Sequence, residues 1–311
     1  MNELKKEYNI YFHYDFDGFA SAAVIYDFLT KNNSKIKSFN PVNYDLKNKW
    51  ENFKFKPNPI IVDFYYHPLS NFWFDHHETT FIKKEWQKKF KPSAYHHFNP
   101  KYKSCCTLII EKLKKYFNYK PSKYIKNLSQ WLDVIDGANY KSASQTIFLK
   151  EPALQIDAFI DQSKKTPLWL IKSLPYYSLK QISNLKKIKK FIIQEKKRRI
   201  DLLKIYYKNL KIYNQKIAFI DKTKIKGSLR YAPFYFLPNI NYNLILRKKK
   251  LYILTLGANP WKKNKNKIHI GKFLRKNFGG GGHKNVGGAE FKTKKEAETA
   301  ILKIINFLNK K

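Results

Sequence analysis

The sequence predicts an α/β protein: an N-terminal doubly wound domain with a mainly parallel sheet, and a smaller C-terminal α+β domain joined by a long helical linker. Over residues 8–150, short apolar runs alternate with helical patterns, which is typical of parallel strands covered by helices. A long amphipathic pattern follows, and strand patterns predominate beyond it. A chain of 311 residues is long enough for two domains. We place the boundaries at 1–150, 151–212 and 213–311.

The elements of the first domain follow from apolar patterning. A strand that is buried on both faces has a continuous apolar run, and a helix repeats its apolar residues every three or four positions. The predicted strands are 8–14, 35–40, 59–64 and 71–74, and the predicted helices are 19–30, 104–116 and 128–135. The adjacent Cys105 and Cys106 cannot form an ordinary disulfide, so we expect them to be small buried residues on the second of these helices.

The linker and the second domain differ in pattern from the first. Residues 178–207 carry isoleucine and leucine on one stripe and lysine on the other sides, which predicts one long amphipathic helix. Runs typical of strands then recur, two of them close enough to form a hairpin. The predicted strands are 216–221, 242–247, 250–257 and 290–292, and the predicted helices are 270–278 and 295–308.

The net charge of +39 is the most unusual feature of the composition. Only five of the 62 basic residues are Arg, although Arg is the residue suited to bidentate phosphate recognition. We therefore interpret the charge as a general lysine bias that tolerates anionic substrates, and not as the mark of a DNA-binding protein. No apolar run approaches the roughly 18 residues of a membrane span, and residues 1–8 lack an apolar signal segment. We expect a cytoplasmic protein without membrane contact.

Acidic and histidine side chains follow three of the predicted strands. On an extended backbone, side chains two residues apart point the same way, so the first group should line up on one face. Ligands of parallel sheets gather at the carboxyl ends of the strands, where we expect all three groups to meet. The groups are His13, Asp15 and Asp17; Asp63; and Asp75, His76 and His77.

A further acidic ligand is expected from the predicted helix 128–135. Asp133 and Asp136 lie three residues apart and can share a helix face; we prefer Asp133, but the residues do not separate the two. Carboxylates and imidazoles without thiolates suit Mn²⁺, Mg²⁺ or Fe²⁺. The set exceeds the need of one ion, and two ions about 3.5–4 Å apart are the usual arrangement for phosphoester hydrolysis. We expect two divalent ions, with Mn²⁺ preferred and Mg²⁺ as the alternative.

A glycine-rich segment, FGGGGHKNVGGAE at 278–290, holds six of the 11 glycines within ten positions. Consecutive glycines allow backbone N–H groups to approach an anion, and His283 closes the run. No Lys-Ser or Lys-Thr pair follows at Walker A spacing, and no first strand precedes the run, so a P-loop and a dinucleotide cofactor are excluded. The segment follows a predicted helix and precedes a strand, which favours a shaped loop.

These motifs, in this order, resemble the DHH phosphoesterase superfamily with its DHH-associated C-terminal (GGGH) domain, as in nanoRNases and oligoribonucleases. The resemblance covers nearly the whole chain and rests on HYDFDGFASA, VDF, FDHH, WLDVIDGA and FGGGGHKNVGGAEF. It implies that residues 1–150 form the catalytic domain and 213–311 the substrate-binding domain. Two segments depart from it. LTLGANPW at 254–261 lacks the Arg of the Ser-x-Arg-Ser-like strand found in many relatives, and the fourth motif lacks the Asp-Thr-Gly form of short-oligonucleotide nucleases.

The resemblance also implies a role for each motif residue. His13 and Asp15 would hold one ion; Asp17, His76 and the fourth-motif Asp would hold the other; Asp63 would bridge them. His77 would act on the scissile phosphate as an acid or electrostatic stabiliser, and Asp75 would orient the histidines. The substrate phosphate or terminal nucleotide would be bound by Gly280, Gly281, Gly282 and His283.

The expected function is a metal-dependent phosphodiesterase that hydrolyses short oligonucleotides or linear or cyclic dinucleotides through a hydroxide activated by two metal ions. A homodimer is one option for its assembly. Three alternatives stay open: a single-strand exonuclease acting on longer DNA or RNA, a non-catalytic nucleotide-binding protein of the same fold, and a hydrolase of pyrophosphate or polyphosphate. An exonuclease of long strands would need an extended groove lined with aromatic side chains, for which the chain leaves little room.

Overall fold

The computed structural model describes residues 4–262 and 268–310 of the chain. Its contacts divide the chain into two compact units: Met1–Asn139 with Glu151–Ile192, and Tyr140–Lys150 with Ile193–Lys311. The domain boundaries at 150 and 212 stay a prediction. We call the units the N-terminal unit and the C-terminal unit.

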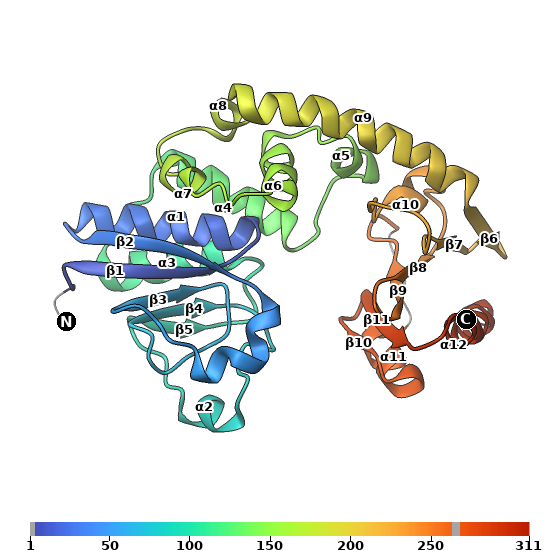
Figure 1. Cartoon of the computed structure of the whole chain (residues 1–311), viewed down its shortest axis with the longest axis horizontal. Helices are drawn as coiled ribbons and strands as arrows, with labels where there is room; N and C mark the ends of the chain where they lie inside the picture. The colour runs from blue at the N-terminus through green and yellow to red at the C-terminus, as the bar shows by residue number, and fades with distance from the viewer. Residues whose placement is uncertain (1–3, 263–267, 311) are drawn as a thin grey trace. The chain divides into compact units, whose positions relative to one another are not determined.

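The N-terminal unit is built on a five-stranded sheet in the order β2-β1-β3-β4-β5, and every neighbouring pair is parallel (Figure 1). This confirms the α/β class and the parallel sheet. The sheet edge at the carboxyl ends of β1, β3 and β4 is where the predicted site residues begin. The strands are β1 (Glu7–His13), β2 (Lys35–Val42), β3 (Pro59–Val62), β4 (Phe72–Asp75) and β5 (His96–Phe98).

Both faces of the sheet are covered at its centre, where β3 and β4 are buried along their whole length. On one face Phe12 packs edge-on against Phe19 of α1, with 5.0 Å between the ring centroids. On the other face Tyr11 and Trp73 join an aromatic cluster around the buried Trp50. The covering elements are α1 (Phe16–Lys31) and α3 (Cys105–Phe117) on the first face, and η1 (Tyr44–Asn52) and α2 (Lys84–Lys89) on the second.

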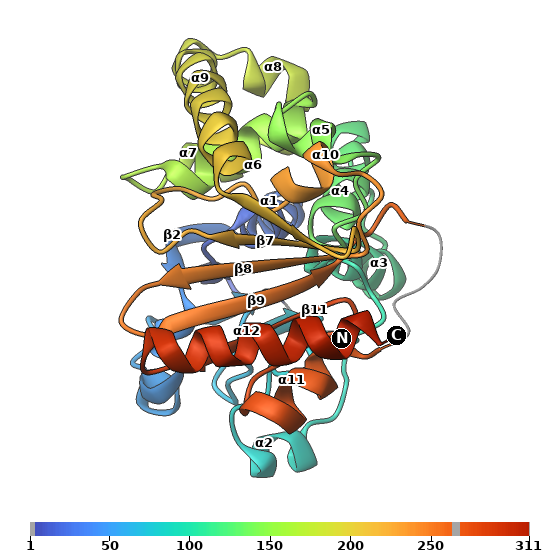
Figure 2. The same cartoon turned by 90° about the vertical axis from the view of Figure 1, so that its right-hand side faces the viewer.

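The C-terminal unit holds a six-stranded mixed sheet in the order β10-β11-β9-β8-β7-β6, in which only the pair β7–β8 is parallel. The predicted hairpin is confirmed as β8–β9, and Figure 2 shows α12 lying along this sheet. The strands are β6 (Leu210–Tyr213), β7 (Ile217–Asp221), β8 (Tyr242–Lys248), β9 (Tyr252–Ala258), β10 (Gly281–Gly282) and β11 (Val286–Phe291). Its helices are α5 (Ala143–Ile147), α10 (Ala232–Phe236), α11 (Ile270–Phe278) and α12 (Lys294–Asn309).

The predicted single helix over 178–207 is wrong, because two helices occupy this stretch. Ser178 begins α8 (Leu179–Ser183) with a capping box to Gln181, and Asn184 ends the helix. A second helix, α9 (Lys186–Lys208), then runs from the N-terminal unit into the C-terminal unit. The apolar stripe continues across the break, since Ile182 and Ile188 are both buried, so periodicity alone does not reveal it. The other helices are α4 (Lys123–Ile135), α6 (Pro152–Gln162) and α7 (Trp169–Ser173).

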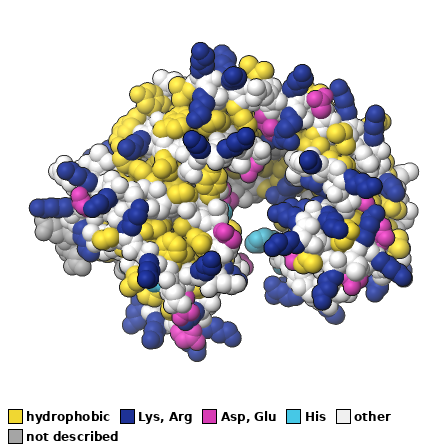
Figure 3. Space-filling view, viewed as in Figure 1, with side chains coloured by type: hydrophobic (Ala, Val, Ile, Leu, Met, Phe, Trp, Pro, Cys, Tyr) yellow, Lys and Arg dark blue, Asp and Glu magenta, His cyan; other side chains and the backbone are white. Residues whose placement is uncertain are grey.

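The surface reflects the lysine bias of the sequence. Figure 3 shows Lys and Arg side chains scattered over the visible face of both units, without one dominant patch. The positive charge on this face therefore does not mark a particular site.

Within the described part of the chain, each helix is too short or too polar to cross a lipid bilayer.

Candidate metal centre

The first site residues come from the junction between β1 and α1. His13 is the last residue of β1, and its Nδ1 lies 2.7 Å from Oδ2 of Asp15. Asp15 caps α1, because its Oδ1 accepts a hydrogen bond of 2.9 Å from the N–H of Gly18. The expectation of an extended backbone through Asp17 is wrong, since α1 begins at Phe16. Asp17 therefore reaches the centre from the first turn of a helix and not from a strand.

Asp17 is held by the N-terminus of α3. Its carboxylate accepts backbone hydrogen bonds from Cys105 N–H at 2.6 Å and Cys106 N–H at 3.0 Å. The first N–H groups of a helix lack partners within the helix, and they favour a negative charge. Both thiols are buried and free, as predicted, but the contribution of the two cysteines to the site comes from their backbone.

Asp63 occupies the middle of the centre. It follows β3 with a φ of 57°, a left-handed conformation that is uncommon for a residue with a side chain. Its side chain is buried, and neither carboxylate oxygen accepts a hydrogen bond in the described structure. Oδ2 lies 3.8 Å from Nδ1 of His13 and Oδ1 lies 3.7 Å from Nε2 of His76. Burial and the neighbouring Asp17 raise the pKa of Asp63 well above its usual value.

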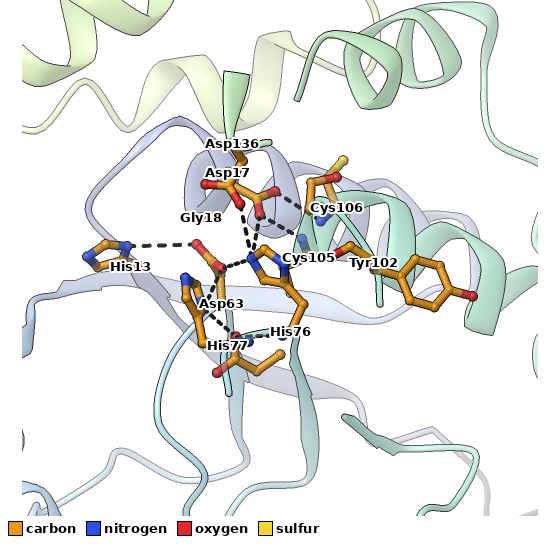
Figure 4. A network of polar contacts seen from close by, with 12 residues as sticks. His13, Asp17, Gly18, Asp63, His76, His77, Tyr102, Cys105, Cys106 and Asp136 are labelled. Atoms are coloured by element: carbon orange, nitrogen blue, oxygen red, sulfur yellow. Dashed lines mark hydrogen bonds and ion pairs between the residues drawn. The ribbon is translucent and has the colours of Figure 1, made fainter. Parts of the chain in front are cut away.

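The DHH sequence, residues 75–77, supplies the next group (Figure 4). The Nδ1 of His76 lies 3.1 Å from the carbonyl oxygen of Tyr102, an acceptor only, so Nδ1 carries the proton and Nε2 is left with a lone pair. That Nε2 lies 3.7 Å from Asp17 and 3.3 Å from Asp136. Nε2 of His76 thus faces the surrounding carboxylates with a lone pair that is able to hold a metal ion.

His77 is oriented by Asp75. Its Nδ1 lies 2.8 Å from Oδ1 of Asp75, whose other oxygen accepts the hydroxyl hydrogen bond of Thr80. Burial alone would lower the pKa of His77, but the hydrogen bond to Asp75 and the surrounding carboxylates raise this pKa to about 9. The ring therefore carries a positive charge near neutral pH in the absence of bound cations.

Asp133 and Asp136 have different positions. Asp136, the C-cap of α4, reaches His76, whereas the Oδ1 of Asp133 accepts hydrogen bonds from the hydroxyls of Ser104 at 2.6 Å and Thr107 at 2.9 Å. Asp133 thus ties α4 to the N-terminus of α3, which holds Asp17. The geometry favours Asp136 as the fourth-motif ligand, against the preference for Asp133.

Potential ligand atoms within 4.8 Å of one another form three groups in the described chain. The cluster can therefore hold metal. The buried atoms without hydrogen-bond partners include both Asp63 oxygens and Nε2 of His76, which is the expected state of ligands awaiting a cation. The role of each residue stays a prediction. The groups are His13, Asp15 and Asp63; Asp17, His76 and Asp136; and Asp63, Asp75, His76 and His77.

One residue near the centre was missed by sequence reasoning. The Tyr44 ring of η1 lies 4.4 Å from the His13 imidazole and is stacked on Phe64 at 5.4 Å, measured between centroids. Its 40% exposed surface places it at the edge of the cluster. No motif or periodicity in the 41–53 stretch distinguishes this tyrosine from the 21 others in the chain.

The predicted phosphate-binding residues lie in the C-terminal unit, in the short hairpin β10–β11. The N–H of Gly280 donates to Leu274 O and that of His283 to Val286 O, so these two N–H groups are already used. Gly282 has a φ of 134°, and a Cβ on Gly271 would lie 1.9 Å from the Gly282 carbonyl oxygen. Close packing of α11 on β10 thus requires a glycine at 271, and close pairing with β11 leaves no room for a Cβ on Gly280, which would lie 2.2 Å from Gly288 O. Substrate binding by Gly280, Gly281, Gly282 and His283 stays a prediction.

Comparison with known proteins supports the fold. No family model and no curated protein matches the sequence. Among solved structures, the pGpG-specific phosphodiesterase PggH from Vibrio cholerae is 16% identical with a TM-score of 0.73, covering 97% of this chain and 99% of that one. The DHH domain of a protein described as a member of a family of ribosomal proteins is 16% identical with a TM-score of 0.62, covering 96% and 86%.

RecJ from Thermus thermophilus, solved with Mg²⁺, is 12% identical with a TM-score of 0.55, covering 98% of this chain and 50% of that one. The chain therefore shares its architecture with a phosphodiesterase, a DHH domain and half of RecJ. This likeness shows the fold, and it is the fold that the resemblance in the sequence motifs implies.

Gly18→Ala is expected to disturb the centre although it places the better helix former inside α1. A Cβ at Gly18 would lie 2.0 Å from the carbonyl oxygen of His13, so the start of α1 must move away from the end of β1. We expect the variant to lose at least about tenfold in Mn²⁺ affinity, measured by calorimetry. Unchanged affinity together with raised thermal stability would contradict the close approach.

Proposed function

We propose that the protein is a metal-dependent phosphodiesterase acting on short oligonucleotides or on linear or cyclic dinucleotides. The observation that carries this proposal is the buried carboxylate of Asp63, which has no hydrogen-bond donor and lies between His13 and His76. Burying an uncompensated charge is costly, so this arrangement makes physical sense when cations complete it. The shared fold with a phosphodiesterase supports the same conclusion.

We assign two divalent ions to the cluster, Mn²⁺ in preference to Mg²⁺. His13, Asp15 and Asp63 would hold one ion, and Asp17, His76 and Asp136 the other, with Asp63 shared. When bound, such a pair supplies Lewis-acid chemistry and lowers the pKa of a coordinated water. The N-terminus of α3 keeps Asp17 in place, and Tyr102 O fixes the His76 tautomer.

His77 and Asp75 would act on the substrate side of the centre. Asp75 holds Nδ1 of His77, and Nε2 of His77 is then the nitrogen available to donate a hydrogen bond or a proton to a phosphate oxygen. The one-third exposed side chain of His77 contrasts with the buried Asp63 and Asp75 behind it. The ring thus has access to a substrate while its orientation is fixed from within.

Short substrates are favoured by the likeness to a phosphodiesterase that is specific for a dinucleotide. The chain spans 99% of the pGpG-specific phosphodiesterase but only 50% of RecJ, so the remaining half of RecJ has no counterpart in this alignment. A protein that follows a long strand needs an extended series of backbone and base contacts. We therefore place linear and cyclic dinucleotides ahead of long DNA or RNA.

The expected activity is hydrolysis of a dinucleotide that depends on added Mn²⁺ and disappears with excess EDTA. The assay compares kcat/KM for pGpG, pApA, a cyclic dinucleotide and a long single strand, with pyrophosphate as a substrate lacking a nucleoside. We expect the best short substrate to exceed the long strand by at least about tenfold, because it occupies a compact site fully. Preference for the long strand would support the exonuclease alternative, and no turnover of any substrate would contradict the enzymatic proposal.

A further inference from the structure

The C-terminal unit contains a cavity of about 300 Å³ that the proposed metal chemistry does not use. This volume is at the lower end of the range of about 300–1,000 Å³ for small-molecule sites. Its walls come from the segment before and within α5, from α10 and from the stretch after β9, all within this one unit. The side chains that matter to the argument are Lys141, Ser142, Ser144, Phe234, Tyr235 and Trp261.

The aromatic wall is rigid and offers ring faces. Trp261 donates its indole N–H to Tyr140 O at 2.7 Å, and its ring lies 5.3 Å from that of Tyr231. Its backbone N–H donates to Oδ1 of Asn259 at 3.0 Å, and the amide of Asn259 donates to the Pro238 and Ile240 carbonyls. With its polar atom already bonded, the indole can offer a ligand only its π-surface.

Tyr235 completes the aromatic wall from α10. Its ring lies 5.5 Å from the Phe148 ring, and 40% of the residue is exposed to solvent. A large aromatic side chain that lines a cavity and remains this accessible can stack on a planar ligand without moving first.

The segment before and within α5 supplies polar groups to the lining of the cavity. The hydroxyls of Ser142 and Ser144 lie 2.9 Å apart, and Nζ of Lys150 donates to Ser144 Oγ at 3.3 Å. Lys141 adds an exposed ammonium group, and none of the described lining residues is acidic. Hydroxyls and ammonium groups beside aromatic rings suit a ligand that joins a planar heterocycle to a phosphate.

We propose that this cavity binds a nucleotide, with the nucleobase stacked on Trp261 and Tyr235 and the phosphate near Lys141. The inference rests on the proposed function, because a phosphodiesterase of short oligonucleotides supplies such a ligand. The amide of Asn259 is occupied by backbone groups, so it does not read the edge of the base. Stacking accepts the face of any base, and purines and pyrimidines should therefore both bind.

The first experiment measures binding to the full chain by calorimetry in excess EDTA, where metal-dependent hydrolysis is absent. The probes are AMP, CMP and ribose 5-phosphate, which lacks a base. We expect AMP and CMP to bind within about tenfold of each other and at least about fivefold more tightly than ribose 5-phosphate. Equal binding of AMP and ribose 5-phosphate, or binding of one base class alone, would overturn the proposal.

The second experiment uses variants of the aromatic wall. Tyr235→Ala removes a partly exposed ring, and Trp261→Ala removes the fixed one; each should weaken AMP binding at least about fivefold and leave ribose 5-phosphate binding unchanged. Tyr177→Ala, which removes a 53% exposed tyrosine of the N-terminal unit, is the matched control. Circular dichroism verifies folding, and Tyr235→Ala keeps the test valid if Trp261→Ala unfolds.

Wild-type AMP affinity in both wall variants would overturn the assignment. Because these titrations contain no available metal, their outcome is independent of whether the centre hydrolyses phosphodiesters. A protein that binds AMP as described but hydrolyses nothing would overturn the proposed function and leave the binding site standing.

Discussion

We expect Asp63→Asn to abolish phosphodiesterase activity while making the metal-free protein more stable. The substitution keeps the shape of the side chain but removes the charge that the two proposed ions share, so kcat/KM should fall by about 10³-fold or more. In EDTA the same change removes a buried negative charge that no cation compensates. The carboxylate of Asp63 has no hydrogen-bond partner and is repelled by the charges of Asp15, Asp17 and Asp75. The free energy of unfolding in urea should therefore rise by about 1–3 kcal/mol.

The stability gained on binding Mn²⁺ distinguishes a metal-binding role of Asp63 from a general loss of structure in the variant. Wild-type protein should gain about 2.7 kcal/mol when Mn²⁺ is present at 100 times its dissociation constant, and Asp63→Asn should gain much less at the same concentration. The control is Asp201→Asn, which also neutralises one carboxylate but on a side chain that is 58% exposed on α9. A variant that is inactive and also less stable in EDTA would show that Asp63 supports the fold and not a cation.

The secondary structure of the site was predictable because it follows from local patterns. The apolar runs ending at His13, Asp63 and Asp75 identified β1, β3 and β4 to within about two residues, and parallel topology then brings these ends to one sheet edge. The order of the motifs added the resemblance to a superfamily, and the fold shared with solved structures agrees with the fold that this resemblance implies.

The environment of each side chain was less predictable, because it depends on groups distant in sequence. Nothing in DFDGFA indicates that Asp17 is held by the backbone of Cys105 and Cys106, 88 and 89 positions away. Nor does it indicate that Gly18 lies inside α1, where the close approach of His13 O requires a glycine. Periodicity reports which face of an element is buried, but not which partner meets it.

The choice between Asp133 and Asp136 shows the same limit on a single helix. Three residues apart, the two share a face, and sequence offers no means to tell which carboxylate is already engaged. In the structure Asp133 accepts from two hydroxyls on α3, whereas Asp136 reaches His76. We therefore expect Asp136→Ala to reduce Mn²⁺ affinity by about 10- to 100-fold with little change in unfolding free energy in EDTA.

Asp133→Ala should reduce the stability of the fold more than it reduces metal binding. It leaves the hydroxyls of Ser104 and Thr107 without their acceptor, which should lower the free energy of unfolding by about 1–3 kcal/mol. Mn²⁺ affinity should fall less than in Asp136→Ala, because the α3 backbone still holds Asp17. Calorimetric titration and urea unfolding of the two variants provide the comparison, each serving as the other's control. If Asp133→Ala loses Mn²⁺ while Asp136→Ala binds it like wild type, Asp133 and not Asp136 is the ligand that joins Asp17 and His76.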